Sequence, residues 1–142
     1  MSVANGVNGT NVINGNKGST RHIPRVASLY ALGDGTSGFE GILHGGLTTA
    51  LLDESLNIVY EVNTTLGKTR GVFAGTSVTA SLNVRFVASM GTTEDAVCLT
   101  AWVEEIRGLY TMKAELTDAK WDRLAESEGV FFVVKSAIRS QN

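Results

Sequence analysis

The sequence has very little cysteine, histidine or proline. Its 142 residues include one cysteine, two histidines and one proline. A single cysteine excludes an internal disulfide framework, and one cysteine with two histidines leaves few ligands for a zinc site. No apolar run approaches the length of about 18 residues that marks a membrane span. The sequence therefore predicts a protein without a metal centre, a disulfide bond or a membrane-spanning helix.

An excess of charge of one sign is also missing. The net charge is −2 and the isoelectric point is about 5.6, which argues against binding to nucleic acid or anionic membrane by bulk charge. With 43% hydrophobic and 18% charged residues, the chain is expected to form one globular domain with its own core. No apolar export signal is present, so we expect a cytoplasmic protein, with organelle targeting as an alternative because the start is basic and poor in acidic residues.

Glycine, in contrast, is abundant, with sixteen residues. Residues 1–22 are rich in Asn and Gly and lack helix or strand periodicity. Their few small apolar residues cannot offset the entropy lost on ordering. We therefore predict a disordered tail over residues 1–22 and a single folded domain over residues 23–142.

Hydrophobic periodicity in the folded part predicts one long helix and an antiparallel sheet. Residues 45–62 have a wide apolar surface with almost no helix breakers, which is typical of a mostly buried helix. Alternating apolar residues, or short apolar runs, predict strands over residues 26–32, 78–87, 97–104, 110–117 and 130–134. Residues 119–126 fit either a helical turn or a strand entry. The predicted fold class is α+β, with one buried helix wrapped by one antiparallel sheet.

Two sequence features that could indicate a dinucleotide site or a cysteine nucleophile lack the surroundings that such sites need. Gly33, Gly35 and Gly38 fit the G-x-G-x-x-G pattern of dinucleotide sites, but the helix begins several residues later and the strands alternate as antiparallel ones do. We therefore expect a flexible loop there. Cys98 lies in the middle of a predicted strand and is expected to be a packed thiol. His22 falls in the predicted tail, which leaves His44 as the histidine expected to be ordered.

The segment from His44 to Glu54 is the strongest candidate site. Gly45 and Gly46 stand at the predicted helix start, where backbone N–H groups lack partners and the helix dipole is positive. Without side chains, these glycines would let a ligand carbonyl approach the N–H groups as an oxyanion site. Asp53 follows two helical turns later. From the residues alone, a site and a tight turn with a solvent-facing acidic stripe are both open.

The sequence His44-Gly45-Gly46, followed by Leu52-Asp53, resembles the helix start of hotdog-fold thioesterases of the phenylacetyl-CoA thioesterase and thioesterase-superfamily type. The resemblance covers about residues 25–135 and includes residues 38–41 and 79–84. It implies the hotdog fold, in which a curled antiparallel sheet wraps one long helix.

The resemblance also implies roles for individual residues. The Gly45 N–H would polarise a thioester carbonyl, and Asp53 would activate water or attack directly to form an anhydride. His44 would orient the loop and the substrate carbonyl. Thr79, from the neighbouring subunit, would help to place the water or the carboxylate. Candidate substrate-binding residues are Gly46, Thr49 and Asn83.

The chain departs from the family pattern in two places. Some members carry an Asn six residues before the histidine, and here that residue is Gly38. The stretch between Asp53 and Thr79 is longer than usual, so residues 64–76 are expected to extend the helix or to cover the acyl pocket.

The function that the resemblance implies is hydrolysis of an acyl-CoA or acyl-carrier-protein thioester to a free acid and a thiol, by a homodimer or homotetramer. A thiol is a good leaving group, so no metal or redox cofactor is needed. The product could belong to polyketide or fatty acid metabolism. Two alternatives stay open: a non-catalytic acyl-CoA-binding hotdog protein, and a dehydratase or hydratase that pairs His44 with Asp53 or Glu54. Basic residues that could meet CoA phosphates are Lys68, Arg70, Arg85, Arg107 and Lys113.

Overall fold

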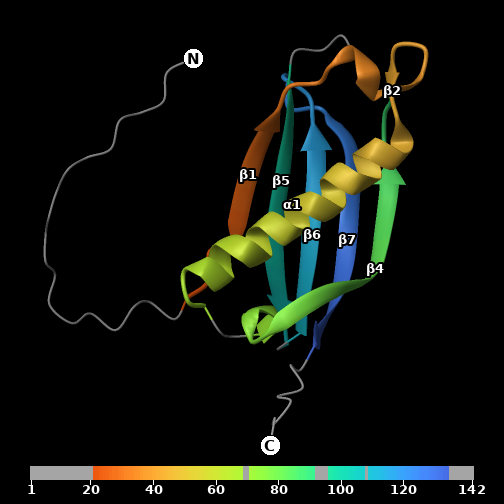
Figure 1. The fold of residues 1–142 in the computed structure, drawn as a ribbon. Coiled ribbons are helices and arrows are strands. Elements are labelled where there is room, and N and C mark those ends of the chain that lie inside the picture. Colours follow the sequence, from red (N-terminus) through yellow and green to blue (C-terminus); the bar gives the residue numbers. More distant parts are fainter. Residues whose placement is uncertain (1–20, 69–70, 92–95, 108, 135–142) are drawn as a thin grey trace, which may run out of the picture.

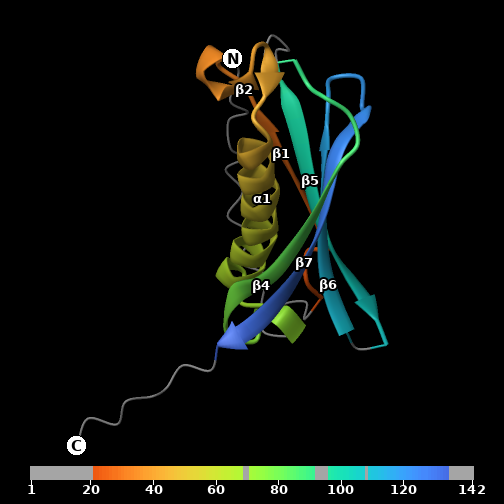
Figure 2. The same cartoon turned by 90° about the vertical axis from the view of Figure 1, so that its right-hand side faces the viewer.

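One long helix lies diagonally across one face of an antiparallel sheet (Figure 1). The computed structural model describes residues 21–68, 71–91, 96–107 and 109–134. The sheet has five strands in the order β1-β5-β6-β7-β4, and their bounds are β1 Arg25–Tyr30, β4 Thr76–Phe86, β5 Val97–Ile106, β6 Leu109–Thr117 and β7 Arg123–Val134. The helix, α1, spans Gly45–Thr65. The predicted α+β architecture is confirmed, and Figure 2 shows the helix on one side of the twisted sheet only.

The helix is held by a stripe of apolar side chains at helical spacing. Leu52, Leu56 and Val59 are fully buried in the core that α1 forms with the sheet. Burying each of them stabilises the fold by about 1.5–3 kcal/mol relative to leaving it exposed. The helix predicted over residues 45–62 is confirmed and continues for three residues beyond Val62.

Asn63 connects the C-terminal end of α1 to Ile23, two residues before β1, by hydrogen bonds. This side chain is fully buried. Its Nδ2 donates to the Ile23 carbonyl at 3.0 Å and to the Val59 carbonyl at 2.8 Å, while the Ile23 N–H donates to its Oδ1 at 2.6 Å. The amide therefore pairs both backbone groups of Ile23.

Replacing Asn63 by leucine is expected to lower the free energy of unfolding by about 2–3 kcal/mol, because the half-buried Ile23 backbone groups lose their partners. Chemical denaturation followed by circular dichroism measures this change. Thr65→Ala, at the exposed end of the same helix, is the control and should shift the midpoint little. A wild-type midpoint for Asn63→Leu would contradict the stabilising role of the hydrogen bonds between Asn63 and Ile23.

The first described residues include His22, which belongs to the predicted tail. Residues 1–20 of the predicted tail lie outside the described residues, but His22 is described and packs on the core. Its ring centroid lies 5.7 Å from that of Phe73 and 6.4 Å from that of Tyr110. His44 is therefore not the only placed histidine. The two rings that hold His22 come from segments far along the chain, which sequence periodicity does not connect.

The stretch after α1 closes the end of the core that is remote from the helix start. A short 3-10 helix, η2 (Gly71–Phe73), places Val72 and Phe73 in the core. The Phe73 ring lies 6.2 Å from that of Tyr60, and the Tyr60 hydroxyl donates to the Gly75 carbonyl. Of the described part of the stretch 64–76, only Thr64 and Thr65 extend the helix. The short helix η2 packs against α1, and the expected cover of an acyl pocket stays a prediction.

Residues 119–126, for which the sequence left a helical turn or a strand entry open, form a turn followed by the start of a strand. Asp118 Oδ1 accepts hydrogen bonds from the Lys120 and Asp122 N–H groups at 2.8 and 2.9 Å, which closes the turn. Strand β7 then begins at Arg123 and runs between β6 and β4. The expected central place of the last strand is confirmed, but its outer face is open within one chain, since 65% of Phe132 is exposed.

Strand β4 contains a β-bulge that changes the expected alternation. Ser81 pairs with Val130 of β7 and Thr79 pairs with Phe131, so Ala80 is an extra residue. Leu82 and Val84 pack toward the helix, and the extra residue brings Thr79 to that same face. The uninterrupted alternation expected for residues 78–87, which paired Val78 with Leu82, is therefore wrong: the bulge sends Val78, 48% exposed, to the opposite face.

The glycine-rich loop forms a small hairpin against the helix start. A 3-10 turn, η1 (Asp34–Thr36), leads into β2 (Ser37–Phe39), which pairs with β3 (Ile42–Leu43). Gly41 joins the two strands with a φ of +69°, a conformation that glycine adopts without strain. The loop leads into β2 and not directly into a helix, and the segment expected to be a flexible loop has defined strand pairing.

Candidate active site

The N-terminus of α1 is capped by His44. The Gly46 N–H donates to His44 Nδ1 at 2.8 Å, and the Thr48 N–H donates to the His44 carbonyl at 3.0 Å. The first-turn N–H of Gly45 has no carbonyl one turn earlier in the helix to accept it. The cap thus occupies the Gly46 donor and leaves the Gly45 N–H open to a ligand oxygen, at the positive end of the helix dipole.

Two glycines make room for the His44 cap. A Cβ on Gly46 would lie 2.9 Å from His44 Cε1, and a Cβ on Gly38 would lie 2.8 Å from His44 Cα. A side chain at Gly38 would therefore displace the backbone of the cap residue. The side-chain donor that the resemblance led us to look for at residue 38 therefore does not fit here without a shift of the loop.

Asp53 of α1 and Thr79 of β4 are in direct contact. The Thr79 hydroxyl donates to Asp53 Oδ1 at 3.1 Å, and Asp53 is half-buried. Both residues belong to the same chain, so this contact forms without the neighbouring subunit from which Thr79 was expected to come. The bulge at Ala80 is the cause, because it turns Thr79 toward the helix.

Gly45, Thr49 and Asp53 form one stripe along the helix because they are spaced by four residues. The Thr49 hydroxyl donates to the Gly45 carbonyl at 3.0 Å, so its proton is used within the helix. At 1.5 Å rise per residue, Gly45 and Asp53 are about 12 Å apart along the axis. One chain therefore brings Asp53 to Thr79 but keeps both away from the Gly45 N–H.

The other predicted substrate-binding residue lies elsewhere. Asn83 alternates with Leu82 and Val84, which face the helix, and it borders a hollow on the opposite face of the sheet. The structure does not bring it to Asp53 in this chain. Sequence reasoning missed Phe86, whose ring would lie 3.6 Å from a Cβ on Gly45. Its only signal was an apolar side chain at the end of a strand.

Two of the candidate cations are used in ion pairs on the outer face of the sheet. Arg85 pairs with Glu126 at 2.6 Å, and Lys113 pairs with Glu104 at 2.9 Å. The hydrogen bond from Lys113 holds the pKa of Glu104 below its ordinary value. These side chains are on the face away from Asp53. Arg70 lies outside the described residues.

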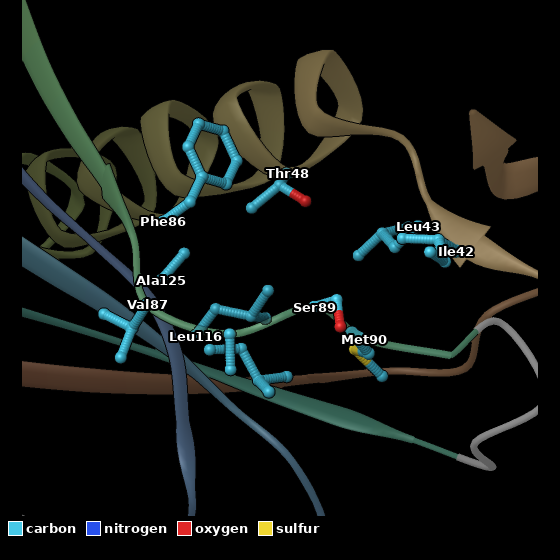
Figure 3. A pocket seen from close by; sticks show the side chains of 11 residues that line it. Ile42, Leu43, Thr48, Phe86, Val87, Ser89, Met90, Leu116 and Ala125 are labelled. Atoms are coloured by element: carbon cyan, nitrogen blue, oxygen red, sulfur yellow. The ribbon is translucent and has the colours of Figure 1, made fainter. Parts of the chain in front are cut away.

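An open cavity of about 330 Å³ adjoins the helix start. Figure 3 shows its lining, with Phe86 and Thr48 on one side and Leu43, Ser89 and Met90 on the other. Within the described ranges, no cluster of His, Cys, Asp and Glu could hold a metal ion. No helix of the described part is both long and apolar enough to cross a membrane. The expected packing of Cys98 is confirmed, since its thiol is buried.

Comparison with known proteins identifies the family of this chain and proteins that share its fold. The model of the thioesterase superfamily matches residues 40–111, and a search of curated proteins finds no match. Three solved structures that share the fold are a hypothetical thioesterase from Streptococcus pneumoniae TIGR4 with coenzyme A, smu.793 from Streptococcus mutans UA159 bound to acetyl-CoA, and zebra fish thioesterase superfamily member 2. Their identities are 14%, 17% and 18%, with TM-scores of 0.64, 0.62 and 0.57. The matches cover 80%, 80% and 77% of this chain and 80%, 83% and 74% of theirs. The family match extends over more than half of the chain and includes His44, the two glycines and Asp53, so the chain belongs to the thioesterase superfamily, with the hotdog fold.

Proposed function

We propose that the protein hydrolyses an acyl thioester, of CoA or of an acyl carrier protein, to a free acid and a thiol. The observation that carries the proposal is the half-buried Asp53 carboxylate, fixed by the Thr79 hydroxyl at 3.1 Å on the helix that begins with the capped glycine pair. Family membership supports the reaction class. The two Streptococcus proteins with bound CoA or acetyl-CoA support a CoA thioester as ligand.

The chemistry needs a base and an oxyanion donor. Thr79 occupies one oxygen of the Asp53 carboxylate, which leaves the other to accept a proton from water. The water oxygen bonds to the thioester carbon, and the carbonyl oxygen takes the negative charge and accepts the Gly45 N–H. The C–S bond then breaks, the thiolate leaves, and it takes up the proton held by Asp53. Direct attack by Asp53 would instead give an anhydride that water opens, with the same products.

Base and donor must come from two chains. Their separation of about 12 Å along one helix is too long for both to act on one carbonyl group. Strand β4 is the terminal strand of the five-stranded sheet and thus offers an unpaired edge to a second copy. We propose a homodimer in which two β4 edges pair antiparallel, so that Asp53 and Thr79 of one chain face the Gly45 N–H of the other. Two such dimers could form the tetramer that the resemblance allows.

The bulge restricts how the two edges can pair. Directly opposed side chains lie on the same face of a sheet, so residues that face the helix must oppose residues that face the partner's helix. The two-fold axis therefore lies between the two copies of one residue. With the axis at Asn83, Leu82 opposes the partner's Val84 and, after the bulge, Thr79 opposes the partner's Phe86. Since Phe86 lies beside Gly45, this register brings Asp53 and the partner's Gly45 together.

Cysteine cross-linking tests this register. Asn83→Cys is expected to form a disulfide-linked dimer under mild oxidation, because opposed Cα atoms in an antiparallel pair lie about 4.5–5.5 Å apart, within disulfide range. Arg85→Cys is the matched control: it shares that face, but its copies would be about 13 Å apart. Non-reducing gel electrophoresis gives the result, and equal cross-linking of both variants, or of Arg85→Cys alone, would contradict the register.

The reaction itself is tested by thiol release. We expect the purified protein to release CoA from acyl-CoA substrates in a chromogenic thiol assay. Saturable binding of acyl-CoA without thiol release would instead identify a non-catalytic acyl-CoA-binding protein. Water addition to an enoyl-CoA would identify a hydratase.

A further inference from the structure

The cavity at the helix start begins where the substrate carbonyl would be bound. Phe86 forms part of its wall, and the same ring would lie 3.6 Å from a Cβ on Gly45. A carbonyl oxygen that accepts the Gly45 N–H therefore has its carbon at the mouth of the cavity. The acyl chain attached to that carbon would extend into the cavity, whose lining side chains are shown in Figure 3.

The described side chains that line the cavity are mostly apolar, and none of them is charged. Thr48 and Ser89 are the only hydroxyl-bearing residues among the described residues that line it, and no Lys, Arg, Asp or Glu side chain does. The Thr48 hydroxyl donates to the His44 carbonyl at 3.3 Å. Leu116, Leu124 and Ala125, which form the inner part, are buried. A carboxylate taken into this volume would lose its hydration without gaining a countercharge, which costs several kcal/mol.

The wall opposite the helix is held at both ends. After β4, the Val87 and Ala88 N–H groups both donate to the Leu124 carbonyl, at 2.8 and 3.0 Å. At the far end, the Leu43 N–H donates to the Met90 carbonyl at 2.9 Å. The segment 87–90 is thus anchored to β7 and to β3, and the cavity between it and the helix start is preformed.

The volume sets the size of the guest. A dry cavity of about 150 Å³ holds one benzene molecule, so about 330 Å³ holds a single ring with a short spacer, or an alkyl chain of about six to ten carbons. A long-chain acyl group would exceed it, and an acetyl group would leave most of it unfilled.

We infer that this cavity is the acyl-binding compartment and selects uncharged apolar acyl groups of medium size over long-chain, very short and dicarboxylic ones. The inference rests on the proposed function for the position of the carbonyl. Ala125 sets the depth, because its small side chain lies between Phe86 and Leu116 and leaves the centre of the cavity open (Figure 3).

The test compares acyl-CoA substrates for wild type, Ala125→Leu and Ala27→Leu. Ala27 is an exposed residue of β1, so Ala27→Leu makes the same change outside the cavity. Wild type should prefer octanoyl-CoA and phenylacetyl-CoA to palmitoyl-CoA and acetyl-CoA, and butyryl-CoA to succinyl-CoA, by at least tenfold in kcat/KM. Ala125→Leu should lower the octanoyl value at least tenfold and the acetyl value less than threefold, while Ala27→Leu keeps the wild-type profile.

A binding measurement separates failure of this inference from failure of the proposed function. Calorimetric binding of octanoyl-CoA to Asp53→Asn, with and without Ala125→Leu, needs no turnover. If no thioester is hydrolysed but Ala125→Leu weakens this binding tenfold, the acyl-binding role of the cavity is supported and the proposed hydrolase function is contradicted. An unchanged substrate profile together with unchanged binding overturns the compartment. Should Ala125→Leu fail to fold, Ala88→Leu at the exposed rim replaces it, with the same expected outcomes.

Discussion

Asp53→Asn is expected to lower kcat for thioester hydrolysis by about 10²–10⁴-fold, the contribution of a positioned general base. The amide keeps the shape of the side chain and an oxygen that can accept the Thr79 hydroxyl bond, but it cannot take the proton from water. The KM for the acyl-CoA should change little, because the carboxylate is not the group that holds the substrate. Steady-state thiol release measures both constants.

Glu54→Gln is the matched control for this change. Glu54 is the adjacent carboxylate on α1 and is exposed, whereas Asp53 is half-buried beside Thr79. We expect Glu54→Gln to keep activity within about twofold, as is usual for a substitution at an exposed surface position. Wild-type rates for a folded Asp53→Asn protein would remove Asp53 from the mechanism. Equal losses for both variants would show that local charge, and not a base, is what matters.

Gly45→Pro is expected to lower kcat by about 10²–10³-fold, the effect of losing one oxyanion donor. Proline is well suited to the first position of a helix, and the residue before it must be extended. His44 already has φ −62° and ψ 126°, so the substitution removes the N–H and keeps the helix start. The thermal midpoint should stay close to that of wild type.

Gly45→Ala separates the N–H group from the glycine. Its Cβ would be 3.6 Å from the Phe86 ring, an ordinary contact, and its N–H remains. We expect it to be much more active than Gly45→Pro. Similar activities of the alanine and proline variants would contradict the role of this N–H.

A mixture of the Asp53→Asn and Gly45→Pro variants tests whether one site is shared by two chains. Each is nearly inactive alone, but a mixed dimer pairs an intact Asp53 with an intact partner's Gly45 at one of its two sites. After random exchange of subunits, about one quarter of wild-type activity should return. No recovery in a mixture shown by mass spectrometry to contain mixed dimers would place both groups within a single chain.

The sequence predicts the helix and much of the site because both depend on local spacing. The stripe of Leu52, Leu56 and Val59 is a property of one segment, and the eight-residue interval between Gly45 and Asp53 follows from the period of the helix. These relations need no knowledge of the rest of the chain.

The remaining features depend on contacts between distant segments. The face that Thr79 presents is decided by the pairing of β4 with β7, which the composition of β4 alone does not reveal. The cavity combines residues from the helix start, the end of β4 and the start of β7, and apolar periodicity predicts burial without predicting where packing leaves a space. The place of His22 was missed for the same reason, because its partners Phe73 and Tyr110 are distant in the chain.

The bulge in β4 matters for how sequences of this kind are aligned. Ala80 carries no chemistry, yet its presence decides whether the hydroxyl one residue earlier reaches Asp53 or solvent. A relative with one residue fewer at this point would need its threonine or serine displaced by one position to fill the same role. Column-by-column comparison would score such a protein as lacking the residue. For this strand, equivalence is therefore defined by which face a side chain occupies, and a gap in the alignment can mark a conserved arrangement.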